Sequence, residues 1–207
     1  MKKKTKALLL LTIFTVILIA GSTLAYLFSL SRSRVNTIPI GYDSIEIVED
    51  FEPPSKQTTV TQYKKAVHIE NTGTVPCFVR VYVDFSDSQI KNISSFSNDG
   101  VNFYAAAEDT SDPNAFINNL PEGWVFVPEG TALLGGYFYF TQPVAPSSPS
   151  AELFKNVKTD YTSAGFDPIQ YDILVYSESV QIIGTDGTDY SKSNDGWRAA
   201  WLEFLRN

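Results

Sequence analysis

The chain has 207 residues, of which 43% are apolar and 14% aromatic, and a formal net charge of −7. This length suits one β domain plus a targeting segment, and the apolar content excludes a disordered chain. The first 25 residues hold four lysines and no acid, so the remainder carries 12 basic and 23 acidic residues and a net charge of −11, which disfavours nucleic acid or an anionic membrane surface as a partner.

Residues 1–25 have the pattern of a secretory signal peptide. A lysine-rich start is followed by an apolar stretch from Ala7 to Ala20, which only two threonines interrupt. The small residues Thr23 and Ala25 stand at the minus-three and minus-one positions of a cleavage site, and Tyr26 would become the first residue after cleavage.

A retained membrane anchor is the alternative to cleavage. No charge appears between Ala7 and Arg32, and an uncharged stretch of that length can span a bilayer. Under either interpretation the N-terminal lysines stay inside the cell, and the part of the chain that follows the apolar stretch lies outside it. The sequence therefore predicts a secreted or surface protein that meets the membrane only through its leader, during export or if the leader is uncleaved.

Residues 26–40 form a candidate extended segment. Tyr26, Phe28 and Leu30 alternate with Leu27, Ser29 and Ser31, so one face is rich in apolar side chains. The segment is either a tail or first strand of the domain's own, or a donor strand that completes the sheet of a neighbouring subunit. In the second case Tyr26, Phe28 and Leu30 would make the contacts.

The stretch from Asn71 to Phe85, NTGTVPCFVRVYVDF, organises residues 41–207. It opens with a tight turn, in which Gly73 is expected to take a positive φ. Strict alternation follows, with one apolar face made of Cys77, Val79, Val81, Val83 and Phe85. A register slip of one residue would bury the opposite, partly charged face, so we predict the central strand of a β-sandwich.

Further strands are predicted on both sides of this one, and helical spacing appears only at the end. The strand ranges are 45–48, 64–70, 101–106, 123–127, 133–140 and 168–182. A helix is predicted over 195–206, capped by Asn194 or Asp195 and packed on the edge or end of the sandwich. Its apolar face contains Trp197, Ala200, Trp201, Phe204 and Leu205. The expected fold is all-β, an antiparallel two-sheet β-sandwich, jelly-roll-like or immunoglobulin-like, with a C-terminal helix.

No catalytic, cofactor or metal site is predicted. The single histidine, His68, lies on a predicted strand and outside any HExxH helix, which disfavours a zinc protease. The acids Glu49, Asp50 and Glu52 suit a solvated turn. The acidic loop over 185–195 lacks the spacing of a calcium loop.

The only cysteine, Cys77, cannot form an intrachain disulfide. Its place on the apolar face of the central strand predicts a small buried side chain. Interchain pairing and thiol reactivity are the alternatives.

Several motifs occur in a characteristic order along the chain: AGSTLAY, EDFEPP, NTGTVPCFVRVYV, YFYF leading to ELFKNV, ESVQ and DGWRAAW. Together they resemble the TasA/camelysin-like exported proteins of Gram-positive bacteria. The resemblance implies export through a dedicated signal peptidase and a β-sandwich outside the cell. It further implies a biofilm-matrix or surface-fibre subunit that self-associates through donated N-terminal strands, without a cofactor.

Two other functions compete with the fibre subunit. One is a monomeric binding module for a cell-wall or matrix polymer or a host ligand, which would use exposed Tyr137, Tyr139, Trp124 or Phe78. The other is the metalloprotease activity described for camelysin-like proteins, which the single histidine disfavours.

Overall fold

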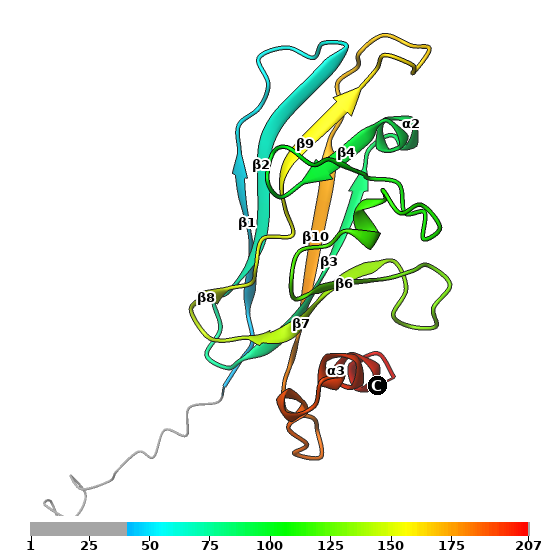
Figure 1. Ribbon diagram of the computed structural model, residues 1–207. Coiled ribbons are helices and arrows are strands. Elements are labelled where there is room, and N and C mark those ends of the chain that lie inside the picture. The colour runs from blue at the N-terminus through cyan, green and yellow to red at the C-terminus, as the bar shows by residue number, and fades with distance from the viewer. Residues whose placement is uncertain (1–40, 207) are drawn as a thin grey trace, which may run out of the picture. The chain divides into compact units, whose positions relative to one another are not determined.

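The computed structural model describes residues 41–206, which form two antiparallel sheets packed as a sandwich (Figure 1). This confirms the predicted fold class. Within the described range no helix is long and apolar enough to cross a membrane.

Sheet A has six strands and sheet B has four. Sheet A follows the order β1 (Ile45–Phe51), β2 (Val60–Asn71), β9 (Phe154–Asp160), β4 (Ser94–Ser97) and β5 (Tyr104–Ala105), and β8 (Ser148–Pro149) also pairs with β2. Sheet B follows the order β10 (Ile173–Gln181), β3 (Cys77–Phe85), β7 (Tyr137–Val144) and β6 (Trp124–Val127). Among the described residues the helices are α2 (Ser88–Asn92) and α3 (Gly196–Phe204), and two 3-10 turns cover Phe116–Asn118 and Tyr190–Lys192.

β3 lies between β10 and β7, in the interior position predicted for it. Its apolar face packs against side chains of sheet A such as Val67, Ile69 and Phe154, and all of these are buried. Both sheets and both clusters of buried apolar side chains lie within residues 41–206. A body that begins at Gly41 therefore forms one compact unit that contains both sheets and both clusters.

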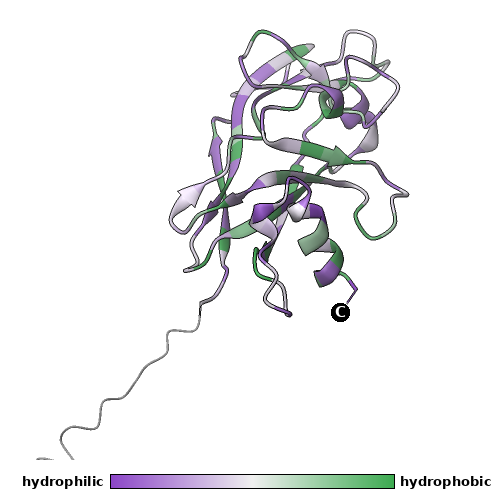
Figure 2. Ribbon diagram, turned by 60° about the horizontal axis from the view of Figure 1, so that its bottom comes forward, coloured by the Kyte–Doolittle hydropathy of each residue, from purple (hydrophilic) through white to green (hydrophobic). Residues whose placement is uncertain are grey.

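Helix α3 covers one end of the outer face of sheet B, at the start of β3 and the end of β10, whereas the sequence predicted packing on the edge or end of the sandwich. Its buried residues Trp197, Ala200 and Trp201 pack against Phe78, Tyr139 and other side chains of that face. The turns of α3 alternate between apolar and polar colours in Figure 2, as expected for a helix with one buried face. Asp195 is the N-cap residue, but its side chain makes no capping hydrogen bond.

Arg80 joins α3 to the sheet. Its side chain points out of sheet B, yet the residue is only 4% exposed, because the rings of Tyr137 and Trp201 lie 4.0 and 4.4 Å from its guanidinium carbon. Arg80 Nε donates to Glu178 Oε2 at 2.6 Å, and another guanidinium nitrogen donates to the hydroxyl of Tyr139 at 3.2 Å. The buried charge is thus paired and stacked between aromatic rings.

Two local expectations were wrong. Gly73 does not have a positive φ. A side chain there would instead place its Cβ 2.6 Å from Ser44 N and 2.6 Å from Tyr42 O, so close backbone contact requires the glycine. Strand β4 and helix α2 lie within residues 87–100, where no strand or helix was predicted, because these elements are too short to show a period.

Removing the Arg80 charge should destabilise the body. We expect Arg80→Met to lower the free energy of unfolding by about 3 kcal/mol, because Glu178 would lose its partner while the volume is kept. Urea denaturation of the variant measures this loss. The double variant Arg80→Met/Glu178→Gln should recover part of it, and a loss below about 1 kcal/mol in the single variant would contradict the role assigned to Arg80.

Candidate functional site: the open edge between β1 and β10

The edge strands β1 of sheet A and β10 of sheet B lie beside each other on one side of the sandwich. Asp43, just before β1, accepts hydrogen bonds from Ser179 Oγ at 2.9 Å and from Gln181 Nε2 at 3.3 Å, at the end of β10. The start of β1 therefore meets the end of β10, and the two strands run in opposite directions. They belong to separate sheets, so no ladder of main-chain hydrogen bonds joins them.

The main chain of β1 is unpaired along its outer side. The N–H of Thr72 donates to Ser44 O at 2.9 Å, and the N–H of Glu52 donates to Lys64 O at 3.0 Å. Hydrogen-bonded pairs alternate in an antiparallel ladder, so the even-numbered residues of β1 face β2. The odd-numbered residues turn their N–H and C=O groups outward, and residues 41–206 offer these groups no hydrogen-bond partner; they are Ile45, Ile47, Glu49 and Phe51.

Strand β10 shows the same alternation. The N–H of Ser86 donates to Asp172 O at 2.9 Å, so the even-numbered residues of β10 face β3. The outward main-chain groups belong to Ile173, Val175, Ser177, Ser179 and Gln181. A groove of about 640 Å³ runs between the two edges, lined by residues 46–49 and 173–175. Leu174, which lines the groove, and Tyr176 next to it are 55% and 53% exposed.

The opposite edges are short and partly paired. β5 has two residues, and the N–H of Ala105 donates to Asn114 O at 2.9 Å. β6 has four residues, and the N–H of Trp124 donates to Pro121 O at 3.1 Å. Within residues 41–206, the long unpaired edge therefore lies at β1 and β10.

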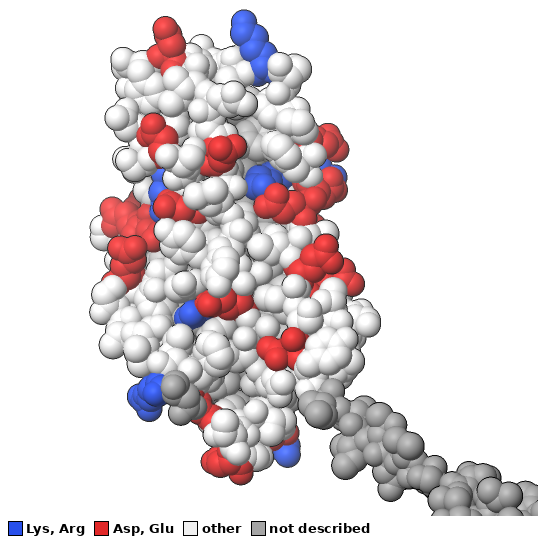
Figure 3. Space-filling model, turned by 180° about the vertical axis from the view of Figure 1, so that it is seen from behind, with Lys and Arg blue, Asp and Glu red and all other residues white. Residues whose placement is uncertain are grey.

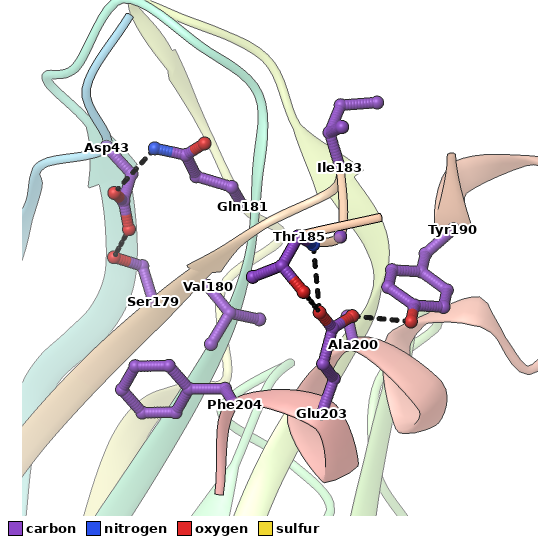
Figure 4. Close-up of a pocket in the computed structure, with 11 residues that line it drawn as sticks. Asp43, Ser179, Val180, Gln181, Ile183, Thr185, Tyr190, Ala200, Glu203 and Phe204 are labelled. Atoms are coloured by element: carbon purple, nitrogen blue, oxygen red, sulfur yellow. Dashed lines mark hydrogen bonds between the residues drawn. The ribbon is translucent and has the colours of Figure 1, made fainter. Parts of the chain in front are cut away.

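A second hollow, which we name the end pocket, lies where β10 ends (Figure 4). It has a volume of about 580 Å³ between β10, the loop after it and helix α3. Val180, Ile183 and Phe204 form apolar walls. Two carboxylates, Asp43 and Glu203, also line the pocket, and its lining contains no lysine or arginine.

Glu203 is held in place by three donors. Its Oε1 accepts from the N–H and the hydroxyl of Thr185 at 2.8 and 2.5 Å, and its Oε2 accepts from the hydroxyl of Tyr190 at 2.6 Å. The hydrogen bonds from Thr185 and Tyr190 hold the pKa of Glu203 below its usual value. The end pocket therefore contains an ionised carboxylate at neutral pH.

The surface around both hollows is mainly acidic. Seen from behind in Figure 3, the body shows many more acidic than basic side chains. Glu46 and Glu49 line the groove. Glu49 forms an ion pair with the buried Lys65 at 2.7 Å, whereas Glu46 has no such partner among the described residues.

The predicted signal-cleavage and donor-strand residues lie outside the described range. They are Thr23, Ala25, Tyr26, Phe28 and Leu30. The unpaired edge and the end pocket were not predicted, because neither the strand order nor the place of α3 can be read from local periodicity.

The aromatic side chains expected to be exposed for ligand binding are covered. Tyr139, Phe78 and Trp124 are 0%, 1% and 4% exposed, and Tyr137 is partly buried. Tyr139 and Phe78 pack under α3, whereas Trp124 packs into the main core and donates its Nε1–H to Ala151 O at 2.9 Å. The prediction of an exposed aromatic surface at these positions was wrong, since nothing in the local pattern placed a helix over sheet B.

The acids considered for a metal site are engaged elsewhere. Asp50 pairs with Lys64 at 2.5 Å, and Glu52 lies 3.9 Å from the same amine. Asp186 and Asp189 accept hydrogen bonds from N–H groups two residues on. His68 lies within β2, opposite Val48. Over residues 41–206 no group of three or more histidine, cysteine, aspartate or glutamate side chains is arranged to hold a metal ion.

In comparisons with known proteins, no protein-family model and no curated protein matches this chain.

Cys77 should make stability depend on pH. Burial raises the pKa of its thiol to about 12, and the Asp43 carboxylate adds to the shift. The pKa of a cysteine thiol in the unfolded chain is about 8.5, so above that pH the unfolded state loses a proton that the folded state keeps. The free energy of unfolding should therefore fall as pH rises, by up to about 1.4 kcal/mol per pH unit.

Urea unfolding at several pH values compares the wild type with Cys77→Ala. Between about pH 7 and 10 the wild type should lose about 2 kcal/mol more than the variant. Parallel pH profiles would contradict the buried, protonated thiol.

Proposed function

We propose that this protein is an exported structural subunit that assembles into fibres by β-strand addition, as implied by the TasA/camelysin-like motifs that it resembles. The incoming strand is residues 26–40 of another copy, which becomes available after cleavage behind Ala25. The acceptor is the unpaired edge of β1, beside β10. Neither a cofactor nor a catalytic group takes part.

The observation that carries this proposal is the unpaired outer side of β1. An exposed strand edge with free N–H and C=O groups is a template for another strand, and soluble proteins usually shorten, cover or charge such edges. Here the edge runs over the seven residues of β1, next to a groove between the sheets. An added strand would complete the ladder and cover Ile45 and Ile47, which are only partly buried.

Charge and spacing favour residues 26–40 as that strand. Apolar side chains recur at Tyr26, Phe28 and Leu30, and the only charges of the segment are Arg32 and Arg34. A basic strand suits a groove lined by Glu46 and Glu49, whereas the same acids would repel the β1 edge of a second body. The acids therefore favour the donated segment over direct pairing of two bodies.

Assembly should require both the segment and the open edge. We expect the protein that begins at Tyr26 to form filaments, visible by electron microscopy and sedimentation. The body that begins at Gly41 should remain monomeric. If both proteins stay monomeric over a wide range of concentration, the proposal is wrong.

A proline on the edge tests the mechanism within the longer protein. The N–H of Ile47 points outward, so Ile47→Pro removes a donor for the added strand without removing a bond to β2. We expect Ile47→Pro to fold but to remain monomeric. Ile47→Ala shortens the same side chain and keeps the N–H, so it is the matched control and should still assemble. Filaments from the folded proline variant would contradict pairing at β1.

A further inference from the structure

The end pocket combines apolar walls with two carboxylates. Val180, Ile183 and Phe204 provide the apolar surface, while Asp43 and Glu203 face the hollow from two sides (Figure 4). Neither carboxylate forms an ion pair within residues 41–206. Both accept hydrogen bonds from neutral groups, which leaves their negative charge unbalanced.

A pocket of this kind fits a side chain that has an apolar chain of methylene groups and a positively charged end. An arginine or lysine side chain buries its methylene groups against apolar surface and keeps its charged end near acids. Arginine fits better than lysine, because its planar guanidinium can donate to two acceptors at once and stacks on aromatic rings. The ring of Phe204, which is 55% exposed, is available for such stacking.

The position of the pocket indicates which arginine would occupy it. Asp43 lies two residues before β1, and its odd number places its side chain on the same face as the inward-facing Ile45 and Ile47. Its carboxylate contacts the end of β10. A strand added antiparallel to β1 would therefore direct the residue opposite Asp43 into the end pocket.

Side-chain alternation and charge allow two registers for the added strand, with either Arg32 or Arg34 opposite Asp43. The apolar face of residues 26–40 has even numbers, and it must lie opposite the odd-numbered residues of β1 to face the groove. Placing Arg34 opposite Asp43 sets Leu30 opposite Ile47 and Tyr26 opposite Phe51. Both registers keep all three apolar residues of the segment on β1, but only the Arg34 register also covers Phe51, which is 48% exposed, so we favour it.

We propose that the end pocket binds the guanidinium of Arg34 from the incoming segment of a second copy, and that this contact fixes the register of the added strand. The inference rests on the proposed strand addition. Residues 35–40 can then span up to ~20 Å to the body that donates the segment. Each copy would donate its segment to the next copy, which is a head-to-tail contact. Contacts of this type can build open filaments, whereas a symmetric contact closes into a dimer.

A double-mutant cycle tests the contact. The binding of a synthetic peptide of residues 26–40 to the body that begins at Gly41 is measured by calorimetry, with Arg34→Gln in the peptide and Asp43→Asn in the body. Arg34→Gln should weaken binding to the wild-type body about tenfold, and binding to the Asp43→Asn body less than about twofold. Glu129→Gln removes an exposed charge between β6 and β7, at the edge of sheet B opposite β10, so that body should retain the tenfold loss.

The outcomes separate this inference from the proposed function. Equal losses on the wild-type and Asp43→Asn bodies, or no loss on the wild-type body, would overturn the pocket contact while leaving strand addition intact. A peptide that fails to bind the wild-type body at all would overturn both. If the Asp43→Asn body does not fold, the Arg34→Gln peptide on the wild-type body still tests the contact.

Discussion

The burial of β3 on both faces is the constraint on which the rest of the body depends. Its inner face packs between the sheets, and its outer face contains Arg80, whose charge must be compensated once α3 covers it. Glu178 and the rings of Tyr137 and Trp201 supply that compensation. Because Glu178 comes from β10, the same contact holds the edge strand, the central strand and the helix together. Strand β10 is therefore joined to β3 and α3 by side-chain contacts as well as by its main-chain ladder.

The fold places its unpaired main chain on one side. The edges at β5 and β6 are short and partly paired with loops, whereas β1 and β10 present longer runs of outward N–H and C=O groups beside a groove. An edge of this kind favours uncontrolled association unless charge restricts its partners. In the proposed assembly, the acids along β1 and in the end pocket restrict the partner to a basic strand. The proposed assembly thus depends on the unpaired edge of β1 and on the negative charge of the residues beside it.

The sequence predicted those parts of the fold that depend on local alternation. The strand at Cys77–Phe85, its interior position and the buried Cys77 were predicted from spacing alone, because a period of two fixes which residues face the core. The covering of Tyr139 by α3 could not be predicted, since it depends on contacts between distant segments. The end pocket was missed for the same reason, because Asp43 and Glu203 lie at opposite ends of the body's sequence.

The most direct test of strand addition at β1 is amide hydrogen exchange along this strand. In the body that begins at Gly41, the outward amides of Ile45, Ile47 and Glu49 should exchange rapidly, while the amides of Glu46, Val48 and Asp50 should be protected by β2. Addition of the peptide of residues 26–40 should protect the first set with little change in the second. If the peptide binds and the outward amides stay unprotected, strand addition at β1 is wrong.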